Sequence, residues 1–168
     1  MVVLANTAFK SQILYTKLSY PVKGPLNFTI INEKADAVYN YVTSDENSLY
    51  FMTNKNAPNY RFIRIDLDHP QQEKWVNILP ENQTKVLKSV VAVNRDYLGV
   101  VYMKDVIDYI EIYGLKDGKH IKTLNTTIGT IETIDAKRQD SELFFKVVSF
   151  LSPGTVYRYD FKGNELKV

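Results

Sequence analysis

His69 and His120 are the only histidines in the 168 residues, so general-base chemistry near neutral pH would have to use one of them. His69 lies in the polar, turn-like segment Asp66-Leu-Asp-His-Pro70, and His120 follows Asp117-Gly-Lys119 at the start of an expected strand. Neither has a recognisable nucleophile, because cysteine is absent and the Gly-x-Ser-x-Gly pattern that presents a reactive serine does not occur. The sequence therefore predicts no catalytic residue, and we expect both histidines to be exposed.

Three carboxylates, Asp105, Asp108 and Glu111, lie close together in the sequence and invite comparison with a metal site. Ca²⁺ requires roughly six to eight converging oxygen ligands, often with a glycine that allows a sharp loop, and this segment supplies neither. We expect these residues to flank a hairpin and to stay in water. The sequence predicts no metal site and no cofactor.

The charge balance argues against a nucleic-acid surface. Lysine and arginine number 21 and aspartate and glutamate 19, which gives a net charge of +2. Acidic residues are interleaved with the basic ones, so we expect a solvated surface and no nucleic-acid partner. The basic side chains considered for such a role are Lys55, Arg61, Arg64, Lys85, Lys88, Lys137 and Arg138.

The apolar stretches of the chain are short, whereas a membrane helix needs roughly 20 apolar residues, so no membrane partner is expected. Residues Met1–Ala5 lack the basic region and the apolar core of a signal peptide. Together with the absence of cysteine, these features predict a cytoplasmic location.

The residue types favour strands over helices. Twelve tyrosines and eight phenylalanines accompany many valines, isoleucines and threonines, which suit a pleated, half-buried surface. Four segments share one alternating pattern and begin 46 to 49 residues apart: Gln12–Leu18, Arg61–Leu67, Tyr109–Leu115 and Thr155–Phe161. Further short strand-like runs precede and follow these segments, separated by polar turns such as Asp117-Gly118.

Four antiparallel strands that recur with this period are typical of a β-propeller blade. We therefore predict an all-β fold, a partial β-propeller of about three and a half four-stranded antiparallel blades. The predicted units are an incomplete blade over residues 1–31 and blades over 37–79, 86–125 and 129–168. The rival interpretation is a β-sandwich, which does not require the same pattern to return at constant spacing. An arc of this size leaves two sheet faces uncovered, so we expect the chain to be part of a larger protein.

The core is expected to consist of aromatic and aliphatic strand residues. These are Tyr50, Phe51, Ile63, Ile65, Trp75, Tyr102, Ile110, Ile112, Phe144, Phe145, Val156 and Tyr157. Burial of one such side chain contributes about 1.5–3 kcal/mol.

Several strings resemble the propeller of the prolyl oligopeptidase family of serine peptidases. They include Tyr50-Phe-Met-Thr-Asn54, Ala57-Pro-Asn-Tyr-Arg61 and, as the most specific match, Ser149-Phe-Leu-Ser-Pro-Gly154. The resemblance covers the chain from about residue 12 onward, and oligopeptidase B and related members share parts of it. It implies a seven-bladed propeller that caps an α/β-hydrolase domain, admits short peptides and excludes folded proteins.

The resemblance also implies a role for this chain. It would be the propeller segment of a peptidase that cleaves short proline-containing peptides after proline, and would contribute gating and size selection without catalytic residues. The hydrolase domain, with its catalytic serine, and the remaining blades would be its partners. At the position of Thr16 the family can carry a cysteine that faces the substrate cleft, so Thr16 is the one candidate substrate-binding residue. Its alternative role is that of an ordinary strand threonine.

A second hypothesis from a different class is a self-standing binding module whose propeller is completed by self-association. Uncovered sheet faces and exposed strand edges give a physical reason for such pairing. A third is a small β-sandwich of unknown role.

Overall fold

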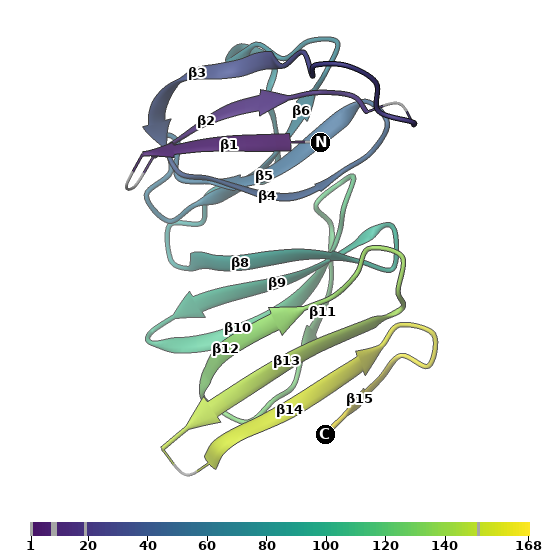
Figure 1. The fold of residues 1–168 in the computed structure, drawn as a ribbon. Coiled ribbons are helices and arrows are strands. Elements are labelled where there is room, and N and C mark those ends of the chain that lie inside the picture. The colour runs from purple at the N-terminus through teal and green to yellow at the C-terminus, as the bar shows by residue number, and fades with distance from the viewer. Residues whose placement is uncertain (1, 8–9, 19, 151) are drawn as a thin grey trace.

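The computed structural model describes residues 2–7, 10–18, 20–150 and 152–168. Its described residues form four antiparallel sheets, each built from strands that are consecutive in the chain (Figure 1). The first sheet contains β1 (Val2–Thr7), β2 (Lys10–Tyr15) and β3 (Thr29–Ala37). The second contains β4 (Tyr39–Ser44), β5 (Ser48–Thr53), β6 (Arg61–Asp66) and β7 (Val76–Leu79).

The other two sheets repeat the order of the second. The third contains β8 (Val86–Val93), β9 (Tyr97–Lys104), β10 (Ile107–Gly114) and β11 (His120–Leu124). The fourth contains β12 (Thr130–Asp135), β13 (Glu142–Ser149), β14 (Ser152–Asp160) and β15 (Glu165–Lys167). The single helical element of the described residues is the 3-10 turn η1 (Gln72–Lys74). The prediction of an all-β, partial propeller is confirmed.

Hairpin turns set the register of these sheets. Asp105 and Val106 alone join β9 to β10, with φ angles of 51° and 66°, and the three-residue turn from β8 to β9 begins with Asn94 and Arg95 at 45° and 63°. Two consecutive residues at positive φ form the kind of tight turn whose twist matches that of the flanking strands. Val106 is unusual in this role because a β-branched residue rarely adopts positive φ.

Neighbouring sheets pack face to face through three apolar clusters. Ile13, Tyr39, Phe51 and Ile63 are buried between the first and second sheets. Other clusters include Tyr50, Leu79, Leu98 and Tyr102 between the second and third sheets, and Val101, Ile110, Leu143 and Phe145 between the third and fourth. The first strands β4, β8 and β12 contact one another from sheet to sheet. The sheets therefore follow one another in an arc, as the blades of a propeller do.

The predicted core is largely correct, with two exceptions on the fourth sheet. Phe144 and Val156 are 41% and 56% exposed, because they face away from the third sheet and none of the other described sheets covers them. Trp75 is half-buried and packs beside the cluster between the first and second sheets. The remaining candidates are all buried: Tyr50, Phe51, Ile63, Ile65, Tyr102, Ile110, Ile112, Phe145 and Tyr157.

Candidate functional site

Thr16 follows the end of β2 and lies between two hollows at one end of the strands. It is 8% exposed. One hollow, of about 420 Å³, is formed with the segment that follows Thr16 and is lined by residues such as Leu18, Val22 and Leu26. The other, of about 340 Å³, is lined by Tyr41, Ser44, Asp45, Glu46, Leu49 and Leu67 of the second sheet as well as by Thr16 itself. The position of Thr16 is thus compatible with contact to a ligand bound at the junction of the first two sheets.

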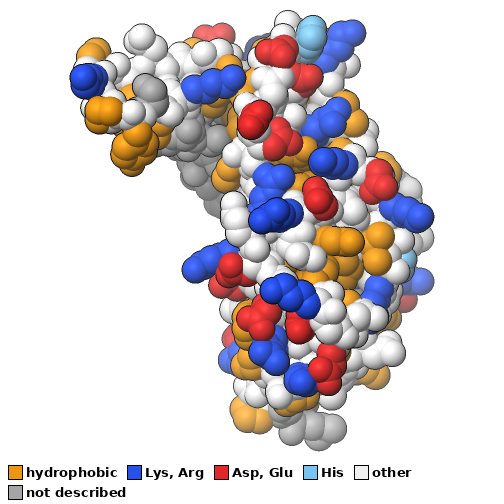
Figure 2. Space-filling model, turned by 90° about the vertical axis from the view of Figure 1, so that its right-hand side faces the viewer, with side chains coloured by type: hydrophobic (Ala, Val, Ile, Leu, Met, Phe, Trp, Pro, Cys, Tyr) orange, Lys and Arg blue, Asp and Glu red, His pale blue; other side chains and the backbone are white. Residues whose placement is uncertain are grey.

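Figure 2 looks onto the side of the molecule toward which β2 and β12 point in Figure 1. Acidic and basic side chains are intermixed over this face, without one broad area of a single sign. This face is therefore polar and of mixed charge.

The two histidines lie where the sequence places them, on exposed turns and strand ends. The His69 backbone N–H donates to the Asp66 carbonyl at 3.2 Å, within the turn that precedes η1. His120 begins β11, where its Nε2 lies 3.2 Å from Thr123 Oγ1 and its ring meets Tyr113 edge-on. Within the described residues, neither imidazole is hydrogen-bonded to a serine. The chain accordingly offers no assembled nucleophile and base in its described part.

The prediction that the carboxylates stay in water is wrong for Asp108 and Glu111. Their side chains are only 2% and 6% exposed. Asp108 Oδ2 accepts hydrogen bonds from Lys88 Nζ at 2.6 Å and from the Ile131 backbone N–H at 2.8 Å. The hairpin tip is the pair Asp105 and Val106, so Asp108 already lies within β10 and faces inward.

Glu111 is held by a second set of donors. Its carboxylate accepts hydrogen bonds from Lys85 Nζ at 2.7 Å and from the Tyr113 hydroxyl at 2.6 Å. Burial alone would raise the pKa of Glu111, but the hydrogen bonds from Lys85 and Tyr113 and the Lys85 charge lower it below its ordinary value. Lys85 and Lys88, expected on a solvated surface, are therefore partners of buried carboxylates.

These buried pairs are structural and do not make a metal site. Within the part of the chain that the structure describes, no three histidine, cysteine, aspartate or glutamate side chains converge to hold a metal ion. None of the described helical elements is long and apolar enough to cross a membrane.

One signal in the sequence could have revealed the burial of Asp108. In a strand, Asp108 lies on the same face as Ile110 and Ile112, which are fully buried.

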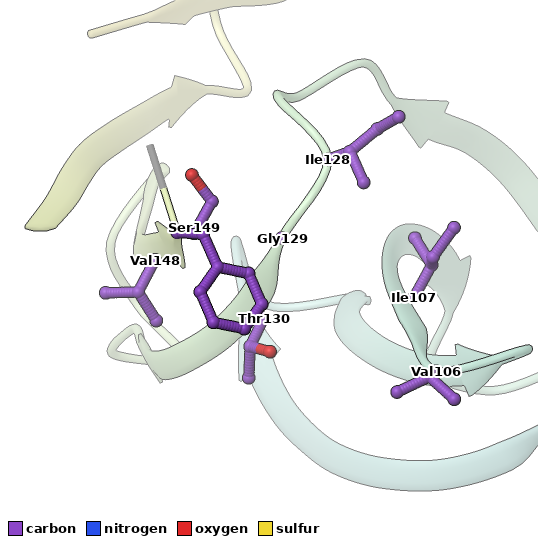
Figure 3. A pocket seen from close by; sticks show the side chains of 8 residues that line it. Val106, Ile107, Ile128, Gly129, Thr130, Val148 and Ser149 are labelled. Carbon is purple, nitrogen blue, oxygen red and sulfur yellow. The ribbon is translucent and has the colours of Figure 1, made fainter. Parts of the chain in front are cut away.

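An apolar hollow of about 490 Å³ lies between the third and fourth sheets, at the end of the strands opposite to Thr16 (Figure 3). Its lining comes from the β9–β10 turn, the connection that precedes β12 and the end of β13, and consists of Val106, Ile107, Ile128, Gly129, Thr130, Val148, Ser149 and Phe150. Val106 and Ile128 expose 87% and 75% of their surface. With no titratable side chain, this hollow can bind apolar groups but cannot transfer protons.

Comparisons with known proteins agree with the arrangement of the strands. The family model "Prolyl oligopeptidase, N-terminal beta-propeller domain" matches residues 2–168. The chain is 32% identical over 131 residues to prolyl oligopeptidase ophP of Omphalotus olearius, covering 78% of this chain and 17% of the relative. It is 26% identical over 161 residues to a prolyl endopeptidase of Elizabethkingia meningoseptica, covering 95% of this chain and 22% of the relative.

A solved structure shows the same similarity in three dimensions. The apo form of prolyl oligopeptidase B from Galerina marginata superposes with a TM-score of 0.87 at 26% identity, over 96% of this chain and 23% of that one. This chain therefore spans about a fifth of the length of the relatives that it matches. Because the family model matches the chain over almost its whole length and the fold superposes, the chain belongs to the prolyl oligopeptidase N-terminal β-propeller family.

Proposed function

We propose that this chain is the propeller part of a serine peptidase that cleaves short peptides after proline. The observation that carries the proposal is the match of the propeller family model to residues 2–168, on a chain whose four sheets superpose on prolyl oligopeptidase B. The peptide bond would be broken by acyl transfer to a serine on a separate α/β-hydrolase domain. The hydrolase domain, further blades and short proline-containing peptides would then be the partners of this chain.

In this role the propeller controls the entry of peptides and selects them by size, and the hydrolase domain carries out catalysis. Two features support this division. Among the described residues, neither His69 nor His120 is hydrogen-bonded to a serine. The described residues that line the hollows beside Thr16 offer polar groups and include no cysteine or histidine. Thr16 would contact bound peptide from the propeller side.

Expression of the complete reading frame that encodes these residues tests the proposal. The complete protein should release the reporter from a fluorogenic peptide with proline before the scissile bond, and should leave a folded protein uncut. The 168-residue chain alone should release nothing. Absence of post-proline cleavage by the complete protein, or cleavage by the isolated chain, would overturn the proposal.

The role of Thr16 can be tested with a thiol probe, since the chain contains no cysteine. In the complete protein, with any cysteine outside these 168 residues replaced by serine, Thr16→Cys should react with a maleimide, and a proline-containing peptide should slow that reaction. Thr130→Cys, beside the apolar hollow at the other end of the strands, is the matched control and should not be protected. Equal labelling of Thr16→Cys with and without peptide would contradict contact between Thr16 and bound peptide.

Self-association is a second candidate role, favoured by the outer face of the fourth sheet. Phe144 and Val156 lie exposed on this face, beside the pair of Arg158 Nη1 and Glu142 Oε1 at 3.0 Å. A second copy could cover these apolar side chains. Light scattering of the chain and of Phe144→Lys tests this: a dimer that the substitution dissociates supports the role, and a monomer in both cases contradicts it. The cytoplasmic location stays a prediction, which fractionation of expressing cells would check.

A further inference from the structure

One arginine connects three of the four sheets. Arg138, in the turn between β12 and β13, donates from Nη1 to the Ser44 carbonyl and to Thr43 Oγ1, the latter at 3.4 Å. Its Nε donates to the Arg95 carbonyl at 3.2 Å. The Arg95 backbone N–H returns a hydrogen bond to the Arg138 carbonyl at 2.6 Å. The guanidinium is thus fixed between the end of β4 and the turns that follow β8 and β12.

Among the described residues, no carboxylate is hydrogen-bonded to or ion-paired with Arg95 or Arg138. Nη2 of Arg138 and the whole guanidinium of Arg95 make no hydrogen bond or ion pair with any residue that the structure describes. Arg158, in contrast, pairs with Glu142. An ordered guanidinium with free N–H groups is suited to binding a carboxylate, because it presents parallel donors at a fixed angle.

The two arginines line one hollow, of about 460 Å³, which we call the arginine pocket. Its other lining residues are Tyr41, Thr43, Ser44 and Gln139, so no carboxylate contributes to it. Tyr41 Oη and Ser44 Oγ are hydrogen-bonded to each other at 2.9 Å and supply further polar atoms. The arginine pocket itself therefore combines two guanidinium groups with hydroxyl groups. Arg95 and Gln139 also border a neighbouring hollow whose carboxylates are Asp140, Glu142 and Asp160, of which Glu142 is paired with Arg158.

The arginine pocket adjoins the hollow beside Thr16. Tyr41 and Ser44 line both. The hollow beside Thr16 contains two acidic residues, Asp45 and Glu46. Asp45 Oδ2 already accepts a hydrogen bond from the Tyr50 hydroxyl at 2.9 Å. A ligand in contact with Thr16 could thus extend past Tyr41 toward the arginines.

We propose that the arginine pocket binds a carboxylate of a peptide ligand, either the C-terminal carboxylate or an Asp or Glu side chain. This inference rests on the proposed function only for the statement that the ligand is a peptide. The site selects peptides by charge, at a place separate from the proline that would define the scissile bond.

Calorimetric titration of the 168-residue chain with N-acetylated pentapeptides tests the proposal. The probes are Ala-Ala-Pro-Ala-Ala with a free C-terminal carboxylate, the same peptide as its carboxamide, and the carboxamide of Ala-Ala-Pro-Asp-Ala. One or both carboxylate peptides should bind about fivefold or more tightly than the uncharged carboxamide, as expected of a hydrogen-bonded ion pair. Which of the two shows the preference identifies the source of the carboxylate. Equal affinity of all three peptides, or no binding, would overturn the proposal.

Variants locate the effect. Arg95→Gln and Arg138→Gln should each remove most of the carboxylate preference. Arg158→Gln removes the same charge outside the arginine pocket and should leave the carboxylate preference unchanged. Arg95 is exposed and its side chain has no partner among the described residues, so Arg95→Gln should keep the unfolding midpoint of the parent chain. A preference that survives Arg95→Gln and Arg138→Gln, or that Arg158→Gln abolishes, would contradict the assignment.

Replacement of proline by alanine in the probes separates this inference from the proposed function. The carboxylate preference should persist with Ala-Ala-Ala-Ala-Ala, because it depends on charge at the arginine pocket. Loss of the preference with this peptide would contradict an independent carboxylate site. Failure of the complete protein to cleave after proline would overturn the proposed function without altering these affinities.

Discussion

The Asp108 carboxylate of β10 accepts a hydrogen bond of 2.8 Å from the backbone N–H of Ile131 in β12. This bond joins the third sheet to the fourth at a place where both groups are buried. Because Lys88 holds the same carboxylate oxygen, the contact combines an ion pair with a backbone hydrogen bond. A polar link between blades thus supplements the apolar packing of their faces.

Asp108→Ala should lower the free energy of unfolding by about 2–3 kcal/mol, because it leaves the Lys88 charge and the Ile131 N–H without their partner. Urea unfolding monitored by Trp75 fluorescence would measure the change. The control is Glu132→Ala, which removes a surface pair with Lys146 and should cost about 0.5 kcal/mol. Equal effects of the two substitutions would show that the Asp108 link contributes nothing beyond a surface pair.

Glu111→Gln should make the free energy of unfolding of the chain less dependent on pH in the acidic range. The pKa of Glu111 in the folded chain lies below its ordinary value of 4.5, so its stabilising contribution is complete above that pH and is lost as the pH falls through the lower, folded-state pKa. The difference in free energy of unfolding between the parent chain and Glu111→Gln should therefore be larger at pH 7 than at pH 3. A difference that stays constant, or grows toward pH 3, would be incompatible with the Lys85 and Tyr113 contacts.

Phe145→Ala and Phe144→Ala should differ strongly although the residues are neighbours. Phe145 is buried and stacks on Tyr157 with ring centroids 5.2 Å apart, so its truncation should cost about 3–5 kcal/mol. Phe144 is 41% exposed on the outer face of the fourth sheet, and its truncation should cost no more than about 1 kcal/mol. Chemical unfolding of both variants measures these losses. A larger loss for Phe144→Ala than for Phe145→Ala would mean that the opposite face of the fourth sheet packs against the third sheet.

Gly118→Ala should be more damaging than Gly24→Ala. Both glycines have positive φ, 63° and 75°, so each substitution strains the backbone by about 1–2 kcal/mol. A Cβ at Gly118 would also meet the Ile78 carbonyl oxygen of the second sheet at 2.0 Å, whereas nothing lies within 4 Å of one at Gly24. The excess loss of stability in Gly118→Ala measures the approach of the third sheet to the second. Equal losses would mean that the two sheets lie further apart.

The repeating pattern of apolar residues was sufficient to predict the sheets, because each blade buries the same alternating positions against its neighbours. Asp108 was placed wrongly because the hairpin turns at Asp105 and Val106, and a β-branched residue at positive φ gives no turn signal in the sequence. Phe144 and Val156 could not be separated from the core, since both faces of the fourth sheet carry apolar residues and only one is covered.

The candidate site was less predictable than the fold. The resemblance to the family pointed to Thr16, but the arginine pocket depends on a hydrogen bond between Arg138 and Ser44, which are 94 residues apart. Such a contact is set by how the sheets follow one another and leaves no trace in local residue patterns. The basic residue Arg138 therefore looks in the sequence like any other solvated side chain.

Mass spectrometry of the cleavage products tests the central claim most directly. The complete protein would be incubated with a set of octapeptides that differ only in the position of one proline. The account predicts that the cut follows the proline as it moves along the peptide, and that the 168-residue chain alone leaves every peptide whole. Cuts at a fixed position independent of proline, or any cut made by the isolated chain, would contradict it.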